Sequence, residues 1–428
     1  MRDLFVTMIV LGALPAVLFQ PWIGVILWSW ISYMNPHRLA YGFAVDFPFA
    51  QLIAIFTIVG LVFCKESKKI PWTREVIVLV IFIAWMLFTT IFALNIDLAW
   101  EQFEKVIKIQ VMTFVTLMVM GSEKRLTYLV WIIVLSLGFY GVKGGLFTIT
   151  SGGGFHVQGP QGTFIGGNNE IGLALIMVIP LMRFLQLQIK QWYFRHAITA
   201  AMLITFVAVL GTQSRGALLG VLAMVLFLVL KSRRKLLLLV LLLGTGYLAY
   251  NFMPESWHER MSTIQTYEED MSAMGRIEAW NFAFRTAVEQ PLTGGGFEVF
   301  SGQTDAHSIY FEILGEHGFI GLILFLALGC LTWFSGGWVI KQAKKNEELR
   351  WCHDMAAMLQ VSLIGYAVSG AFLGLAYFDL YYHLIAMMIL TKVIVIKYLA
   401  DEEKKALVVV KSKLRSNNGM DSPSPTVS

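Results

Sequence analysis

His307 is the side chain best suited to acid–base chemistry, because an imidazole titrates close to neutral pH and can act as a general base. It opens the element His307-Ser308-x9-Gly318-x-x-Gly321, which ends inside an apolar run. If residues 307–318 form one helix, they make about three turns, so His307 and Gly318 share a face. Glu316 then lies opposite and is a poor partner for His307. A single histidine near a membrane interface is more often structural than catalytic, and that alternative stays open.

Arg215 lies in a short turn, Gly211-Thr-Gln-Ser-Arg-Gly216, between two apolar runs. Ser214 can cap the helix that follows, because its hydroxyl can accept a hydrogen bond from a backbone N–H of the first turn. A helix amino terminus beside a guanidinium suits a phosphate or a diphosphate. Two other accounts stay open: Arg215 could extend to lipid headgroups or pair with a carboxylate.

Three more cations are candidate substrate contacts. Arg276 and Arg285 lie in a long polar segment, whose centre at 276–288 has the apolar periodicity of a helix. Either arginine could bind an anion or belong to a solvated helix face. Lys143, in Gly141-Val-Lys-Gly-Gly145, falls inside an apolar run, roughly 10 Å from its end at about 1.5 Å per residue. A charge at that depth is a functional candidate, although a headgroup or carboxylate partner explains it equally well.

Asn168, Asn169 and Asp379 complete the candidate site. The two asparagines precede an apolar run, where an asparagine more often caps the helix than contacts a ligand. Asp379 stands in the aromatic segment 377–383, which is typical of a membrane-interface belt. Asp379 could also orient His307 or an acceptor sugar.

We expect neither a metal nor a cofactor. The three cysteines, Cys64, Cys330 and Cys352, show no ligand or disulfide spacing, and the acidic run 268–270 has no histidine at ligand spacing. The run Gly294-Gly295-Gly296 lacks the Lys-Ser/Thr of a Walker loop. No basic patch or motif indicates nucleic-acid binding.

The elements that position these residues are apolar helices. Hydrophobic residues make up 57% of the 428 positions and charged residues only 14%, well below the roughly 25% of soluble domains. Apolar runs of near-spanning length recur along the chain, which predicts an all-α polytopic membrane protein of about twelve spans. The runs lie near 4–19, 22–35, 49–64, 76–94, 107–120, 126–149, 170–186, 196–211, 216–230, 236–252, 318–340, 356–376 and 383–398.

Basic residues set the expected orientation. Lys and Arg cluster at 65–74, 124–125, 190–195, 231–235, 341–350 and in the tail, so we expect these segments in the cytoplasm. The loops 36–48, 95–106, 150–169, 211–215, 253–317 and 377–382 are then periplasmic, and Arg215 stands on the side where basic residues are disfavoured. We favour twelve spans with both ends in the cytoplasm, in which 4–19, broken by Pro15, is a hairpin arm or an interfacial helix. If 4–19 spans, there are thirteen spans and Met1 is periplasmic.

These blocks together resemble the bacterial O-antigen ligase and polymerase superfamily. The resemblance is carried by the His307 element, by Gly162-Thr-Phe with Asn168 and Asn169, by Ser214-Arg215-Gly216, and by Arg276…Trp280…Pro291…Gly296. The amino-terminal part, with Gly141-Val-Lys-Gly-Gly145, resembles a subgroup described as exosortase-associated O-glycosylation ligases. The corresponding division is a transmembrane region at 1–150, a ligase-like core at 151–400 that includes the loop 253–317, and a cytoplasmic tail at 401–428, polar and disordered from Ser416.

The resemblance implies a GT-C-like, metal-independent, inverting glycosyltransferase of the bacterial inner membrane. Its donor would be a glycan on undecaprenyl diphosphate and its acceptor the lipid A-core oligosaccharide, with His307 as the essential histidine and Arg215 as the diphosphate-binding arginine. An O-antigen polymerase or a protein O-oligosaccharyltransferase would need the same groups and differ in the acceptor. A lipid-linked glycan flippase or another transporter is the alternative outside the enzyme class, but it would place ionisable groups nearer the bilayer midplane.

Overall fold

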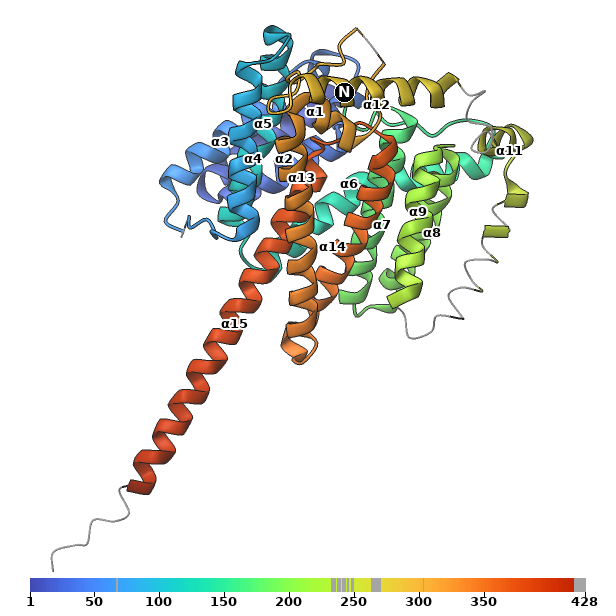
Figure 1. Cartoon of the computed structure of the whole chain (residues 1–428). Coiled ribbons are helices and arrows are strands. Elements are labelled where there is room, and N and C mark those ends of the chain that lie inside the picture. The colour runs from blue at the N-terminus through green and yellow to red at the C-terminus, as the bar shows by residue number, and fades with distance from the viewer. Residues whose placement is uncertain are drawn as a thin grey trace, which may run out of the picture.

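The chain folds into a bundle of α-helices (Figure 1). The computed structural model describes residues 1–418 apart from 67, 232–235, 237–239, 241–243, 245, 248–249, 263–270 and 303. Eight of the helices in this part are long and apolar enough to cross a membrane, and two shorter apolar helices accompany them. The prediction of an all-α polytopic membrane protein is therefore confirmed, while the total of twelve spans stays a prediction.

The helices of the first half follow the apolar runs, with one exception: the helix expected at 107–120 already begins at Ile96, so the expected loop 95–106 is helical from residue 96 onward. They are α1 (Arg2–Phe19), α2 (Pro21–Met34), α3 (Phe49–Phe63), α4 (Arg74–Ile91), α5 (Ile96–Val119), α6 (Glu123–Thr150), α7 (Asn168–Gln188), α8 (Trp192–Gly211) and α9 (Arg215–Lys231). The expected span 236–252 falls largely outside the described residues.

The first apolar run does not lie flat at an interface. The amino end of α1 contacts the segment 36–48, where Asp3 Oδ1 accepts hydrogen bonds from the backbone of Gly42 at 2.9 Å and of Ala44 at 3.2 Å. Its other end, at Leu18 and Phe19, lines a cavity with Cys64, beyond the end of α3. α1 therefore runs parallel to α3 between the same two levels. Packing against α3 holds the run upright despite Pro15, which does not fit an interfacial helix, and whether the run spans the membrane or forms a hairpin arm stays a prediction.

Between α9 and α13, the described residues include two further helices. They are α11 (Glu255–Ser262) and α12 (Met271–Glu289), and α12 confirms the helix expected from the periodicity of residues 276–288. In Figure 1, α12 lies across the end of the bundle, at a steep angle to α13 and α14. Three helices complete the described chain: α13 (Ile309–Ala343), α14 (Arg350–Ser369) and α15 (Asp379–Asn418).

α13 breaks at Gly318, where the backbone adopts φ 66° and ψ −168°. A Cβ atom there would lie 2.6 Å from the carbonyl oxygen of Leu292, so the position has no room for a side chain. The run Gly294-Gly295-Gly296 packs against this break, with Gly295 N donating to Gly315 O at 2.8 Å and Gly296 N to Glu316 O at 2.9 Å. The triple glycine thus has a structural use, since it lets two backbones approach closely.

Gly318→Ala is expected to lower the melting temperature of the detergent-solubilised protein. The backbone of Gly318 lies in a region open almost only to glycine, which costs another residue about 1–3 kcal/mol, and the contact with Leu292 adds to that cost. Gly337→Ala is the matched control in the same helix, because the nearest atom to its Cβ would be 3.9 Å away. Equal melting temperatures for the two variants would contradict the proposed need for glycine at the break.

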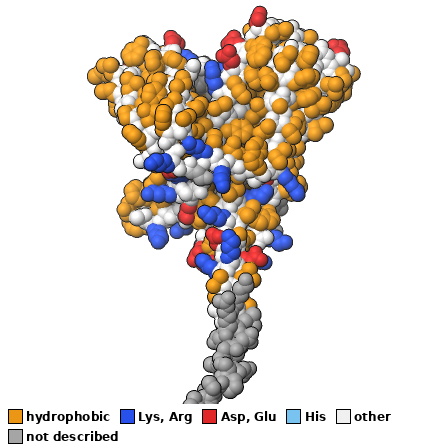
Figure 2. Space-filling model, turned by 90° about the vertical axis from the view of Figure 1, so that its left-hand side faces the viewer, with side chains coloured by type: hydrophobic (Ala, Val, Ile, Leu, Met, Phe, Trp, Pro, Cys, Tyr) orange, Lys and Arg blue, Asp and Glu red, His pale blue; other side chains and the backbone are white. Residues whose placement is uncertain are grey.

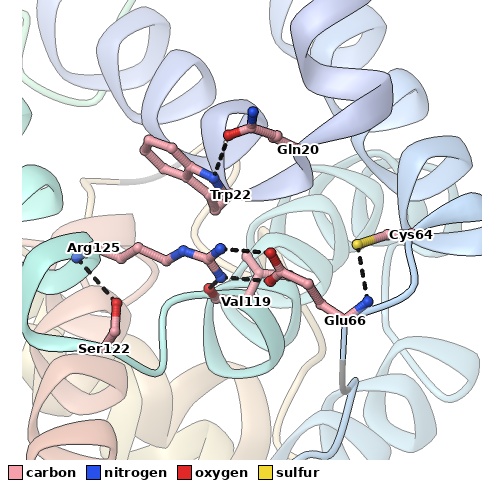
Figure 3. Close-up of polar contacts among 7 residues, drawn as sticks. All are labelled: Gln20, Trp22, Cys64, Glu66, Val119, Ser122 and Arg125. Carbon is pink, nitrogen blue, oxygen red and sulfur yellow. Dashed lines mark hydrogen bonds and ion pairs between the residues drawn. The ribbon is translucent and has the colours of Figure 1, made fainter.

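The loops between the helices meet at two opposite ends of the bundle. Arg125 at the start of α6 donates two hydrogen bonds of 2.7 Å to Glu66, with Trp22 beside its guanidinium (Figure 3). These hydrogen bonds lower the pKa of Glu66 below its ordinary value. The pair joins two of the loops expected to be cytoplasmic, and Figure 2 shows Lys and Arg gathered toward the end from which α15 leaves the body. We call this the basic end.

The opposite end collects loops from all parts of the chain. Leu94 N donates to Gly295 O at 2.8 Å, and Val157 N donates to Gly211 O at 2.9 Å. We call this the site end, because His307 and Arg215 both lie there. The basic residues of the sequence therefore assigned the loops named in these two paragraphs to the correct end of the bundle.

α15 corrects one expectation about the tail. The helix begins at Asp379, crosses the bundle and continues to Asn418, well outside the body (Figure 1). The chain is thus helical at residues 416–418, where we expected disorder, and residues 419–428 lie outside the described part.

Candidate functional site

His307 lies just before α13 and not within it. Its backbone is left-handed, with φ 44°, and the helix begins at Ile309 after the extended Ser308. The expected continuous helix over 307–318 is therefore wrong at both ends, since the chain also breaks at Gly318. A left-handed conformation is uncommon for a residue other than glycine, so the surrounding contacts must hold His307 in place.

Two contacts of Trp280 fasten the His307 segment. The indole Nε1 of Trp280 donates to the carbonyl of Ala306 at 2.8 Å, and its ring stacks on Phe311 at a centroid distance of 5.0 Å. Ala306 is fully buried. These contacts bind α12 to the residues on both sides of His307, which explains how a loop residue keeps a defined position.

His307 is half-buried and has a carboxylate beside it. Its side chain is 34% exposed, and its Nδ1 lies 3.6 Å from Asp305 Oδ2. The two groups are close enough for an electrostatic contact, although no hydrogen bond joins them. In a neutral imidazole, the ring nitrogen without a hydrogen can accept a proton.

α12 separates the two arginine candidates. Arg276 and Arg285 are nine positions apart, which at about 100° per residue puts them on opposite faces. Arg276 is one turn before Trp280 and shares its face, and a Cβ on the neighbouring Gly275 would lie 3.6 Å from Thr304. Arg285 is exposed and lines an open surface hollow. The structure thus brings Arg276, and not Arg285, toward His307.

Arg276→Ala is expected to slow turnover of the native reaction by about tenfold or more, because a charge-assisted contact is worth about 1.5–3 kcal/mol. Arg285→Ala is the matched control on the other face of the same helix and should keep the wild-type rate. The measurement is the initial rate for both variants at equal amounts of folded protein. Equal losses in the two variants would contradict the assignment by face.

Arg215 opens α9 as expected. Ser214 Oγ accepts a hydrogen bond from Ala217 N at 3.2 Å, which confirms Ser214 as the cap of this helix. Asn168 does not cap its own helix, since Gly167 holds that position. Its side-chain amide instead donates to Thr212 O at 2.9 Å and ties the start of α7 to the Arg215 turn. Asn169 lies next to it in the first turn of α7.

One segment, residues 369–377, contacts both the Arg215 turn and the His307 region. At its start, Ser369 Oγ donates to Gly216 O at 3.1 Å. A Cβ on Gly370 would lie 2.7 Å from Ile309, and a Cβ on Gly374 would lie 3.1 Å from Asp305 Oδ2. Arg215 and His307, which are 92 positions apart in the chain (307 − 215), therefore flank a common segment.

A buried polar network behind this segment was not expected from the sequence. His317 is fully buried, with Nδ1 at 2.7 Å from Thr89 Oγ1 and Nε2 at 2.8 Å from the hydroxyl of Tyr377. Tyr377 in turn donates to Glu316, whose other oxygen accepts from Glu298 N at 3.0 Å. Burial raises the pKa of Tyr377 far above its ordinary value, so the hydroxyl keeps its proton as a donor. The network links α4, the break in α13 and the end of segment 369–377.

The apolar run was expected to begin at residue 318, so Glu316 and His317 were expected to lie outside it. Because α13 begins at Ile309, Glu316 and His317 belong to an apolar helix, where ionisable side chains are candidates for function. The prediction that Glu316 is a poor partner for His307 agrees with its bonds to Tyr377 and Glu298.

Two other candidates lie apart from His307. Asp379 is buried and accepts a hydrogen bond from Ser32 on α2, so it is oriented toward the amino-terminal helices and not toward His307. Lys143 is exposed on α6, while the neighbouring Gly141, Gly144 and Gly145 face α8. The expected roles of Asp379 and Lys143 at the same site are not supported by these positions.

The described residues contain no group of three or more His, Cys, Asp or Glu side chains placed to hold a metal ion. The site end offers a candidate base, His307, and the guanidinium groups of Arg215 and Arg276. Such a set can move a proton from a hydroxyl and stabilise a leaving phosphate.

Comparisons with known proteins fit this arrangement. Residues 200–326 match a family model described as O-Antigen ligase, and residues 1–190 match one described as a family of unknown function (DUF5935). The chain is also 31% identical over 170 residues to an O-antigen ligase of Pseudomonas aeruginosa, a match that covers 36% of this chain and 39% of that protein. Residues 200–326 are therefore similar to the O-antigen ligase family, and the chain spans well under half of the length of the relative it matches.

Proposed function

We propose that the protein is a glycosyltransferase of the O-antigen ligase type. It transfers a glycan from undecaprenyl diphosphate to the lipid A-core oligosaccharide at the periplasmic face of the inner membrane. The observation that carries the proposal is the contact of one segment, residues 369–377, with both the Arg215 turn and the His307 region. A base and a phosphate-binding cation beside one segment are what glycosyl transfer from a diphosphate needs.

In the proposed mechanism, the acceptor hydroxyl attacks the anomeric carbon while His307 Nε2 takes its proton. The bond from that carbon to the diphosphate oxygen breaks, and undecaprenyl diphosphate leaves with the electron pair. Arg215 and Arg276 stabilise the charge that develops on the leaving group. Attack from the opposite face inverts the anomeric centre.

Asn168 has a supporting role in this proposal. Its hydrogen bond to Thr212 O holds the turn that carries Arg215 against the start of α7. Asn169, Arg285, Lys143 and Asp379 are not needed for the proton transfer or for the stabilisation of the leaving group.

Reconstitution tests the function directly. Purified protein in liposomes is given a defined undecaprenyl-diphosphate glycan and a rough lipopolysaccharide, and a product of higher mass on the lipopolysaccharide is expected. Polymer that grows on undecaprenyl diphosphate would instead assign the chain as a polymerase. Movement of the intact donor across the bilayer, without transfer, would assign it as a flippase.

Transfer is expected to continue at an unchanged rate in EDTA, because a diphosphate is already a good leaving group and the two arginines supply the positive charge. The same reconstituted assay is run with and without chelator. Activity that is lost on chelation and restored by a divalent cation would contradict the metal-independent mechanism.

A further inference from the structure

A cavity beside His307 is not used by the chemistry above. Its volume is about 370 Å³, within the roughly 300–1,000 Å³ of small-ligand pockets. Its wall comes from the 298–305 loop, the start of α13, segment 369–377, α5 and the 151–167 loop. Asp305 lines the cavity and is also the carboxylate next to His307 Nδ1, so the cavity opens close to the candidate base.

Three carboxylates line this cavity, and a hydrogen bond holds each of two of these residues in place. Glu312 Oε2 accepts a hydrogen bond from Ala376 N at 3.0 Å. Glu298 has a left-handed backbone, with φ 59°, held by the bond from its N–H to Glu316. The third carboxylate is Asp305. The buried network of His317, Tyr377 and Glu316 therefore lies directly behind the acidic wall.

Aromatic and amide groups complete the lining, and they distinguish the cavity from a simple acidic patch. Phe164 is exposed and supplies ring surface, Phe300 and Tyr377 lie in the wall but are buried, and Gln102 supplies an amide. Sugar rings present apolar C–H surface that packs on aromatic rings, while their hydroxyls donate hydrogen bonds to carboxylates. The wall combines partners for both parts of a sugar.

We propose that this cavity binds the reacting sugar of the acceptor, and that this sugar is neutral or carries an amine. The inference rests on the proposed function. Carboxylates accept hydrogen bonds from hydroxyl or ammonium groups but repel phosphate and uronate groups. The diphosphate donor then binds on the side of Arg215 and Arg276, and His307 lies between the donor and the acceptor.

The test uses two synthetic lipid-linked acceptors that differ only in the terminal sugar, a hexose or the corresponding hexuronic acid. Binding of each acceptor to the full-length protein is measured first, without donor, and transfer from a defined undecaprenyl-diphosphate glycan is measured second. Wild-type protein should prefer the neutral acceptor by about tenfold in both assays, which corresponds to about 1.4 kcal/mol.

Glu298→Gln should raise the acceptor KM for the hexose and narrow the preference over the hexuronic acid, with the donor KM unchanged. Glu312→Gln should have the same effect. Its amide oxygen can still accept the hydrogen bond from Ala376 N, so an effect seen in both variants does not come from misfolding of one of them. Glu278→Gln, exposed on the outer face of α12, is the matched control and should change neither ratio.

The outcomes separate the two proposals. Equal binding of both acceptors by the wild-type protein would overturn the cavity assignment even if transfer occurs. Selective binding that responds to Glu298→Gln, with no transfer to either acceptor, would contradict the proposed function and retain the cavity as a neutral-sugar site.

Discussion

His307→Ala is expected to reduce the transfer rate by about 10²- to 10⁴-fold while donor binding stays near the wild-type value. General-base catalysis contributes a rate factor of this size, and the imidazole acts on the acceptor proton rather than on the donor diphosphate. The measurement is the initial transfer rate at saturating donor, together with donor affinity in detergent.

His196→Ala is the control for this variant. His196 lies exposed on α8 and is bonded to Trp192 of its own helix, so its loss should leave transfer unchanged. Full activity in His307→Ala, with normal levels of folded protein, would exclude His307 as the base.

Arg215→Ala should weaken donor binding and slow transfer, with a combined effect of about 2–4 kcal/mol, or about 30- to 700-fold. The proposed partner of Arg215 is the diphosphate, which is charged both before and during the reaction. Removing the guanidinium therefore affects affinity as well as turnover. Donor affinity and initial rate are measured on the same preparation.

Arg215→Lys separates charge from geometry. Lysine keeps the positive charge but loses the planar pair of donors that matches two phosphate oxygens, so activity should recover only in part. If Arg215→Ala binds donor normally while His307→Ala does not, the roles assigned to the two residues are exchanged or wrong.

Local sequence determined the elements and their orientation in the bundle. Apolar runs predicted the helices because a membrane-spanning backbone must satisfy its own hydrogen bonds, and a helix does so within one segment. The cap at Ser214 and the helix over 276–288 depend on neighbours within about one turn, so they were also readable. The basic loops identified one end of the bundle, which the ion pair of Arg125 and Glu66 joins.

The backbone at His307 was not readable, because distant residues decide it. Residues 307–318 were expected to form one continuous helix, because they lead directly into an apolar run. Trp280 of α12 instead holds Ala306, and the carbonyl of Leu292 leaves room only for glycine at 318. These contacts join segments that are far apart in sequence, so no local pattern contains them.

The tertiary structure also decided which charges share the site end. Arg276 and Arg285 looked equivalent until the contact of Trp280 showed which face of α12 turns inward. Asp379 stood in a suitable loop, yet its hydrogen bond with Ser32 orients it away from His307. Sequence alone determined most of the helices and which end of the bundle is basic, because periodicity and charge are local properties. Which side chains meet at the site depended on helix rotation and on breaks such as Gly318, and those are set by packing between distant segments.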